Sequence, residues 1–215
     1  SSKPPTDDRR PNTVERHGRL MDDPYAWLRD AEWQRVMREP DTLNPDIRAH
    51  LEAENAWTEQ ALAPIANLRE ELVAEMKGRI KEDDSSVPAP DGPWSYYRRF
   101  IEGGQYPLLC RRPSADTDGG NEQVLLDGDA EAEGESFFAV GGMIHSPDQR
   151  LFATATDRNG SEYCTIRIRD LETGDLLDDT LPDAQGDMVW AEDAKTLFYT
   201  MLDENHRPCR VVRHV

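Results

Sequence analysis

The chain has 215 residues, with 43 Asp and Glu against 25 Lys and Arg, and a formal net charge of −18 at pH 7. This balance argues against nucleic acid and anionic membranes as partners, because Lys and Arg supply most of the binding to both. It fits either a solvated, salt-adapted surface or the attraction of basic peptides.

The first 80 residues are expected to form an extended arm followed by helices. Residues 1–20 are polar at the start and rich in Pro, which is typical of an arm that is held only when something covers it. Asp23 precedes Pro24, and this pair favours a helix start, since Asp can cap and Pro at the first position has no N–H to lose. A short helix is therefore predicted over 21–30.

Two longer helices are predicted after this one. Asn44-Pro45 repeats the cap-and-proline signal, and the helix should run to about Leu62. Pro64 restarts a helix that ends near Gly78. Its apolar residues recur at steps of three and four, which indicates a packing surface: Ile65, Leu68, Leu72, Met76 and Ile80.

An acidic and polar linker, 81–93, leads into a region of strands. From Trp94 onward the apolar residues alternate or come in short runs between Gly, Asp and Asn, a pattern typical of β-structure. The alternation over 163–169 is regular, so one face of that strand should be buried. The predicted strands are 94–100, 107–112, 122–126, 137–143, 151–156, 163–169, 176–180, 188–190, 196–201 and 209–214.

An internal repeat lies within the strand region. Leu151-Phe152 matches Leu197-Phe198, and further identical pairs share the same offset of 46 (198 − 152). A repeat of roughly 40–50 residues holding four short strands is the size of a propeller blade. The blades are predicted at about 94–126, at 137–180 and from 187 onward.

The predicted fold class follows from these elements. It is α+β, with an N-terminal helical arm (1–80) followed by mostly antiparallel blades of an incomplete β-propeller (94–215). The third blade stops after its third strand at Val215, and a closed propeller has at least four blades. We therefore expect the chain to be part of a longer protein.

The three cysteines, Cys110, Cys164 and Cys209, are far apart and include no CxxC pair. Each lies in a strand-like run, where a buried free thiol behaves as a small hydrophobe. This usage fits a reducing compartment. With no apolar segment of a signal peptide over 1–11, and no apolar run near the roughly 20 residues of a membrane span, the protein is expected to be cytoplasmic.

No residue is predicted to have a catalytic, cofactor-binding or metal-binding role. His145-Ser146-x-Asp148 holds the residue types of a catalytic triad, but neighbours on one strand point to opposite faces. His206-x-x-Cys209 lacks a second pair of metal ligands. No G-x-S-x-G nucleophile motif occurs in the chain.

Other charged and glycine-rich groups have structural interpretations. The carboxylate pairs are interpreted as solvated linker charge, the glycine pairs do not precede a helix as a phosphate loop requires, and the arginine pairs should bridge carboxylates. These groups are Asp83-Asp84 and Glu131-Ala132-Glu133, the glycines at 103–104, 119–120 and 141–142, and Arg98-Arg99 and Arg111-Arg112.

The joint between helices and strands, 78–113, reads GRIKEDDSSVPAPDGPWSYYRRFIEGGQYPLLCRRP. This segment resembles the N-terminal part of the oligopeptidase B (protease II) branch of the prolyl oligopeptidase family of serine peptidases. Further runs that resemble the same branch, in the same order, are DPYAWL (23–28), LEAENAWT (51–58), EQVLLDG (122–128), AEGESFF (132–138), HSPD (145–148), TIRIRDL (165–171), TLFYT (196–200) and LDENHRP (202–208).

The resemblance implies a larger enzyme. Its α/β-hydrolase domain carries a Ser-Asp-His triad, a seven-bladed propeller caps that domain and admits short peptides, and cleavage follows Arg or Lys. The N-terminal segment packs on the hydrolase domain. The resemblance therefore implies a non-catalytic portion that gates substrate access and scaffolds the active site, with short basic peptides and the C-terminal domain as partners and no cofactor.

Two alternatives remain open at this point. The chain could be a non-catalytic, propeller-like interaction module that binds a partner or self-associates through exposed strand edges. It could also be an unrelated enzyme with a site among the strands, although only isolated side chains support that hypothesis. A downstream G-x-S-x-G in the same gene would favour the peptidase over the interaction module.

Overall fold

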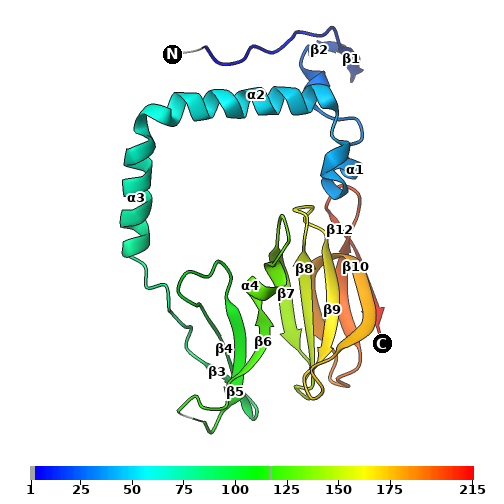
Figure 1. The fold of residues 1–215 in the computed structure, drawn as a ribbon. Coiled ribbons are helices and arrows are strands. Elements are labelled where there is room, and N and C mark those ends of the chain that lie inside the picture. Colours follow the sequence, from blue (N-terminus) through cyan, green and yellow to red (C-terminus); the bar gives the residue numbers. More distant parts are fainter. Residues whose placement is uncertain (1–2, 117) are drawn as a thin grey trace. The chain divides into compact units, whose positions relative to one another are not determined.

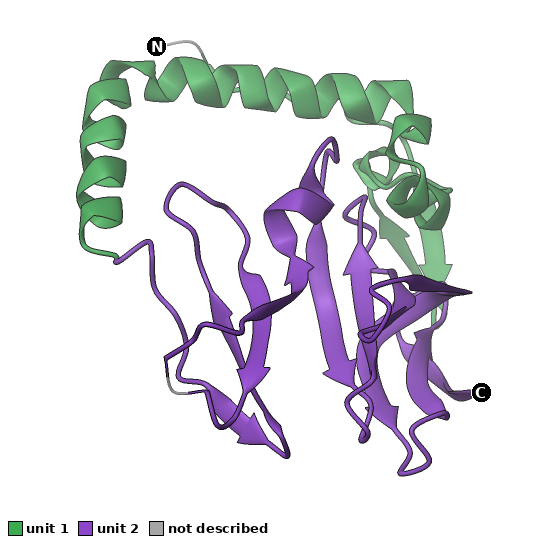
Figure 2. Cartoon of the chain, turned by 60° about the horizontal axis from the view of Figure 1, so that its bottom comes forward, with its two compact units in different colours: residues 1–80 green, residues 81–215 purple. Residues whose placement is uncertain are grey.

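The computed structural model describes residues 3–116 and 118–215, and the chain divides into two compact units. The first unit ends at Ile80 and the second runs from Lys81 to Val215 (Figure 2). The unit boundary falls where the helices were predicted to give way to the acidic linker.

The first unit consists of a hairpin and helices. None of its helices has the length and apolar character that crossing a membrane requires, among the residues described. Its elements are β1 (Thr13–Arg16) and β2 (Arg19–Asp22), the 3-10 helices η1 (Ala26–Leu28), η2 (Pro40–Thr42) and η3 (Ala63–Ile65), and the helices α1 (Trp33–Arg38), α2 (Pro45–Leu62) and α3 (Ala66–Gly78).

The capping signal at Asn44 is confirmed in full. The Asn44 side chain accepts a hydrogen bond of 2.9 Å from the Asp46 N–H, and Pro45 occupies the first position of α2. The helix predicted over 21–30 is wrong in extent, because only the single turn Ala26–Leu28 is helical. The hairpin β1–β2 and helix α1 were not predicted.

The N-terminal arm is held by contacts within its own unit. The Arg10 guanidinium lies 4.1 Å from the ring centroid of Trp27 and donates to Asp46 at 2.9 Å. The Trp27 indole N–H donates to the Asp8 carbonyl at 2.9 Å. A cation–π contact to Trp27 of η1 and an ion pair to Asp46 of α2 therefore hold an otherwise extended segment in place.

The second unit contains two antiparallel sheets, coloured from green to red in Figure 1. The four-stranded sheet has the order β3-β4-β5-β6, and the six-stranded sheet has the order β12-β11-β10-β9-β8-β7. The elements are β3 (Ala89–Asp91), β4 (Trp94–Arg99), β5 (Leu108–Pro113), β6 (Gln123–Asp127), α4 (Gly128–Ala132), β7 (Ala139–His145), β8 (Leu151–Asp157), β9 (Cys164–Asp170), β10 (Leu176–Trp190), β11 (Leu197–Leu202) and β12 (Pro208–His214).

Strand β10 belongs to two blades, whereas two separate strands were predicted. Its first part pairs with β9 from Leu176 to Ala184, and its second part pairs with β11 from Ala184 to Trp190. The backbone passes through positive φ at Asp183 (59°) and Gly186 (114°), so the strand bends without ending. Blade 1 is therefore β3–β6, blade 2 is β7–β9 with the first part of β10, and blade 3 is the rest of β10 with β11 and β12.

The blade repeat is confirmed, but its offset in the strands is 45 residues and not 46. His145 pairs with Phe152 as Trp190 pairs with Leu197, which gives 45 for both positions (190 − 145, 197 − 152). The register between β11 and β12 shifts between Met201 and Leu202, where Cys209 is the extra residue on β12. The offset of 46 therefore holds only in the loops, and the matched Phe residues are not at equivalent strand positions.

Two apolar clusters join neighbouring blades. The smaller one places Phe152 of blade 2 among leucines of blade 1. The larger one packs the Ile166 and Ile168 side chains of blade 2 against blade 3. The buried members of the larger cluster are Ala153, Ala155, Cys164, Ile166, Ile168, Ala184, Trp190, Leu197 and Tyr199. Each blade thus buries one face against the next, as the strand alternation predicted.

The first strands of blades 2 and 3 approach each other at three glycines. A Cβ added to Gly186 would lie 2.8 Å from the Gly141 carbonyl oxygen, and one added to Gly141 would lie 2.5 Å from the Cys164 sulfur. A Cβ on Gly142 would overlap the Gly186 carbonyl oxygen. Glycine is required here because one backbone packs directly on another.

We expect Gly142→Ala to lower the free energy of unfolding by about 1–3 kcal/mol, because the new methyl group must push the two strands apart. The measurement is urea unfolding followed by tryptophan fluorescence. Gly120→Ala is the control, since nothing lies within 4 Å of a Cβ there. Equal stability of the two variants would contradict the close approach.

Candidate functional site

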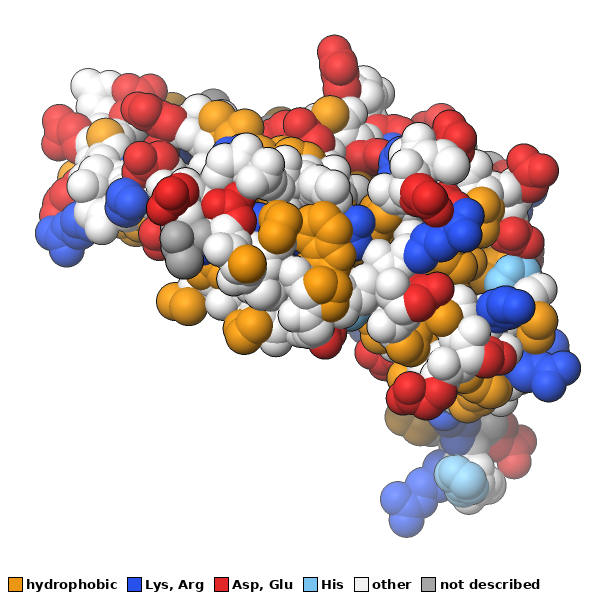
Figure 3. Space-filling model, turned by 90° about the horizontal axis from the view of Figure 1, so that it is seen from below, with side chains coloured by type: hydrophobic (Ala, Val, Ile, Leu, Met, Phe, Trp, Pro, Cys, Tyr) orange, Lys and Arg blue, Asp and Glu red, His pale blue; other side chains and the backbone are white. Residues whose placement is uncertain are grey.

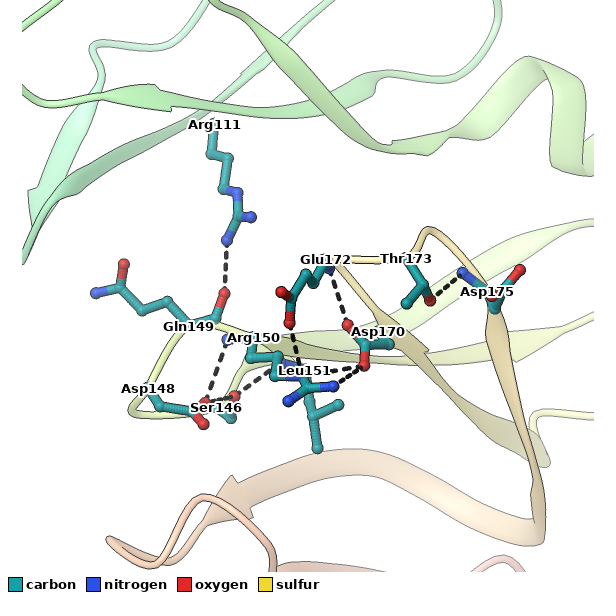
Figure 4. Close-up of polar contacts among 10 residues, drawn as sticks. All are labelled: Arg111, Ser146, Asp148, Gln149, Arg150, Leu151, Asp170, Glu172, Thr173 and Asp175. Atoms are coloured by element: carbon teal, nitrogen blue, oxygen red, sulfur yellow. Dashed lines mark hydrogen bonds and ion pairs between the residues drawn. The ribbon is translucent and has the colours of Figure 1, made fainter.

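The turn between β7 and β8 holds the triad-like residues predicted to be structural. Ser146 is fully buried, donates its hydroxyl to the Asp148 carboxylate at 2.5 Å, and accepts the Leu151 N–H at 2.9 Å (Figure 4). The hydroxyl thus closes the turn. A nucleophile must instead be exposed and hydrogen-bonded to a base.

His145 is directed toward blade 1. Its Nε2 atom lies 3.2 Å from the Asp91 carboxylate, and its ring stacks on Tyr96 with centroids 4.3 Å apart. The ring of His145 and the hydroxyl of Ser146 therefore have different partners. This arrangement joins two blades and does not assemble a nucleophile with its base.

The second pair singled out in the sequence, His206 and Cys209, also has separate surroundings. His206 Nε2 lies 2.8 Å from the Ser161 carbonyl, and the Tyr163 hydroxyl donates to the Asp203 carbonyl at 2.6 Å, so the loops of blades 2 and 3 interlock. Cys209 is exposed at the start of β12. The expectation that all three thiols are buried was therefore wrong for Cys209.

Arg111 is buried between blades 1 and 2, and its contacts differ from those predicted. Its guanidinium donates to the Gln149 carbonyl at 2.6 Å and to the Gln123 side chain at 2.9 Å, and it lies 4.0 Å from the Trp94 ring centroid. Figure 4 shows the Arg111 side chain reaching from the four-stranded sheet to the β7–β8 turn that contains Gln149. The residue was predicted to bridge a carboxylate, and it binds a main-chain carbonyl of the next blade.

Arg150 and Asp170 brace the same turn. The Arg150 guanidinium donates to the Asp170 carboxylate at 2.8 Å and 3.0 Å and lies 3.6 Å from Glu172. Main-chain N–H groups also bond Asp170, including that of Glu172 at 2.8 Å. The Arg150 ion pair, followed by these hydrogen bonds, lowers the pKa of Asp170.

Arg99 does bridge a carboxylate, as predicted. It donates to Glu122 at 2.7 Å and 3.0 Å, and the Tyr97 hydroxyl donates to the same carboxylate at 2.6 Å. The Arg99 contact lowers the pKa of Glu122 to about 2. Burial, and secondarily Glu122, raises the pKa of the Cys110 thiol to about 11, so this thiol stays protonated at neutral pH.

The carboxylates at 131–133 were interpreted as solvated linker charge, and this is wrong for Glu131. The residue lies on α4 and forms ion pairs with Arg158, which also contacts Glu135 at 2.9 Å. Sequence reasoning missed α4 because only five residues are helical. Its cap, Asp127, accepts the Ala130 N–H at 3.0 Å.

Two exposed apolar surfaces are the strongest candidates for docking. One is the stripe on η3 and α3, defined by Ile65, Leu68, Leu72, Met76 and Ile80, all of them exposed. The other is the free face of blade 3, defined by Val189 and Val211. At an offset of 45, Val211 is the counterpart of Ile166, yet Val211 is 76% exposed and Ile166 is 0% exposed.

On the face shown in Figure 3, hydrophobic side chains are interspersed with acidic and basic ones. Among residues 3–116 and 118–215, no cluster of three or more His, Cys, Asp or Glu has the geometry of a metal site.

Comparison with known proteins assigns the family. A model described as "Prolyl oligopeptidase, N-terminal beta-propeller domain" matches residues 4–215. The chain is 40% identical over 230 aligned positions to dipeptidyl aminopeptidase BI of Pseudoxanthomonas mexicana, covering 100% of this chain and 31% of that protein. It is 31% identical to Protease 2 of Moraxella lacunata, covering 99% of this chain and 30% of that protein.

The solved structures agree with the sequence relatives. Oligopeptidase B from Leishmania major matches with a TM-score of 0.89 and 30% identity, over 100% of this chain and 31% of that one. Oligopeptidase B from Trypanosoma brucei matches with a TM-score of 0.87 and 30% identity, over 99% of this chain and 31% of that one. The chain spans about a third of the length of the curated relatives it matches.

We expect Glu122→Gln to lower the free energy of unfolding by about 1–3 kcal/mol at neutral pH, because Arg99 loses its charged partner. The folded pKa of Glu122 is about 2, below the unfolded value of about 4.3. The stabilisation is therefore present above about pH 4.3 and disappears as the pH falls toward 2.

The measurement is urea unfolding of wild type and variant between neutral pH and pH 2. Glu102→Gln, in an exposed turn, is the control and should have little effect at any pH. A stability difference between wild type and Glu122→Gln that stays constant down to pH 2 would refute the ion-pair assignment.

Proposed function

The chain belongs to the prolyl oligopeptidase family through its N-terminal β-propeller domain, and on this premise we propose that it gates substrate access to a serine peptidase domain and scaffolds that domain. The chain itself supplies no part of the catalytic triad in this proposal. The supporting observation is the match over residues 4–215 to a domain defined as a propeller.

The free face of blade 3 supports the proposal that more blades complete the propeller. Val189 and Val211 occupy the positions that Ile144 and Ile166 occupy in blade 2, and those two isoleucines pack on the next blade. Val189 is 55% exposed. A fourth blade would cover this face as blade 3 covers Ile166, and so add apolar burial.

The stripe on η3 and α3 supports a second contact, with the catalytic domain. Leu68, Leu72 and Met76 follow one another at steps of four on α3 and are exposed together. Such a stripe on a helix of a soluble protein indicates a packing partner. In this proposal the partner is the C-terminal α/β-hydrolase domain of the same protein.

Short peptides with Arg or Lys at the cleavage site are the proposed substrates. The resemblance to the oligopeptidase B branch and the net charge of −18 both support basic peptides. The 40% identity to a protein named dipeptidyl aminopeptidase favours a second candidate, the removal of dipeptides from a free N-terminus. The two activities differ in whether a free α-amino group is required.

The decisive experiment uses the whole gene product. Its mass should be about three times 24.4 kDa, because the chain covers 31% of its relative. It should release a fluorophore from a substrate ending in Arg-Arg and lose this activity on treatment with a fluorophosphonate. A product of 24.4 kDa with no such activity would instead favour a non-catalytic interaction module.

Two forms of the substrate separate the candidate activities. Cleavage of an N-terminally blocked Arg-Arg substrate supports oligopeptidase activity, while cleavage that requires the free amino group supports dipeptidyl aminopeptidase activity. A neutral Ala-Ala substrate is the matched control for charge. Equal kcat/KM for the basic and neutral substrates would overturn the proposed basic specificity.

For the docking stripe, we expect Leu72→Gln in the whole protein to weaken the contact between the arm and the catalytic domain by about 1–2 kcal/mol. Faster proteolytic cleavage between the arm and the catalytic domain would show that this contact is weakened. The control is Glu71→Gln, which introduces glutamine at the neighbouring position of α3, outside the stripe, and should leave the rate of proteolysis unchanged. Identical proteolysis of the two variants would mean that the stripe has no such role.

A further inference from the structure

A groove of about 460 Å³ runs along β6 on one side and the β9–β10 turn on the other. All five residues of β6, Gln123–Asp127, line it. Leu125, Leu126 and Leu171 supply apolar surface, and Val124 is 49% exposed. A groove that follows a whole strand has the shape for an extended ligand.

Strand β6 is also an edge strand. It pairs with β5 from Leu108–Asp127 to Arg111–Gln123 and is the last strand of its sheet. An edge strand presents N–H and C=O groups that another strand can bond. Peptides are recognised in this way when they add a strand to a sheet and place alternate side chains in pockets.

The charge on both sides of the groove selects the kind of peptide. Asp127 and Glu131 line the groove, and the flanking segments 127–135 and 170–179 contain five carboxylates each and no Lys or Arg. Four of these ten carboxylates are paired, Glu131 and Glu135 with Arg158, and Asp170 and Glu172 with Arg150, so the carboxylates still outnumber the arginines. Arg169 lines the groove, but its guanidinium donates to the Gly174 carbonyl at 2.8 Å and lies 3.9 Å from Glu131. The balance of charge therefore attracts cations.

We propose that this groove binds an extended basic peptide segment as an additional strand on β6. Valine or a similar side chain of the peptide would contact Val124, and Lys or Arg would face the two acidic segments. The inference goes beyond the gating function, because a strand can bind here whether or not the protein cleaves peptides.

The test measures fluorescence anisotropy of a labelled, acetylated peptide of alternating lysine and valine, added to the whole protein. Prior treatment with a fluorophosphonate prevents cleavage of the probe, so binding and peptidase activity are judged separately. Binding should be saturable. The same peptide with alternate amides N-methylated should lose about tenfold or more in affinity, because strand pairing needs those N–H groups.

Val124→Lys is the variant for the site, and we expect it to weaken binding about tenfold by replacing apolar surface with a like charge. Val87→Lys is its matched control, since Val87 is 88% exposed outside the strands and the change in net charge is the same. It should alter the affinity less than about twofold. Equal loss in the two variants would show a general charge effect and overturn the site.

Two further outcomes would also overturn the proposal. One is equal binding of the N-methylated and unmodified peptides, which would mean that no strand is added. The other is equal binding of a peptide with glutamate in place of lysine, which would mean that the acidic segments do not select the ligand. Peptidase activity can be present or absent in either case, so the two proposals fail independently.

Discussion

The fold depends on each blade burying its apolar face against the next blade. Phe152 enters the leucines of blade 1, while Ile166 and Ile168 on the other face of blade 2 meet Trp190 and Leu197. Alternation along each strand supplies both faces at once. A blade with a neighbour on only one side therefore leaves hydrophobic side chains in water, and Val189 and Val211 are in that position.

Local sequence signals predicted the elements that local interactions determine. Asn44 caps α2 through an N–H two residues away, and the alternation over 163–169 identified β9. The continuous β10 could not be predicted, because Pro182 and Gly186 usually interrupt strands and only pairing with β9 and β11 carries the strand through them. Identical residues at non-equivalent strand positions, such as Phe152 and Phe198, similarly hid the true blade offset.

The candidate sites were harder to predict than the elements, because their partners are distant in the chain. Arg99 finds Glu122 at a separation of 23 residues, and Arg111 finds Gln149 at 38. Both arginines belong to similar Arg-Arg pairs on neighbouring strands, so the sequence alone treated them alike. Comparing Val211 with Ile166 at the blade offset could have identified the free face, since both residues are aliphatic in register.

Because β10 is shared, the joints between blades differ in mechanical stiffness. Blades 2 and 3 have one unbroken backbone running through both ladders, so a force that separates them must break main-chain hydrogen bonds. Blades 1 and 2 are joined by side-chain contacts such as Arg111 with Gln149 and by the chain through α4. Strain applied to these blades would therefore concentrate at the seam between blades 1 and 2, while blades 2 and 3 move together as one body.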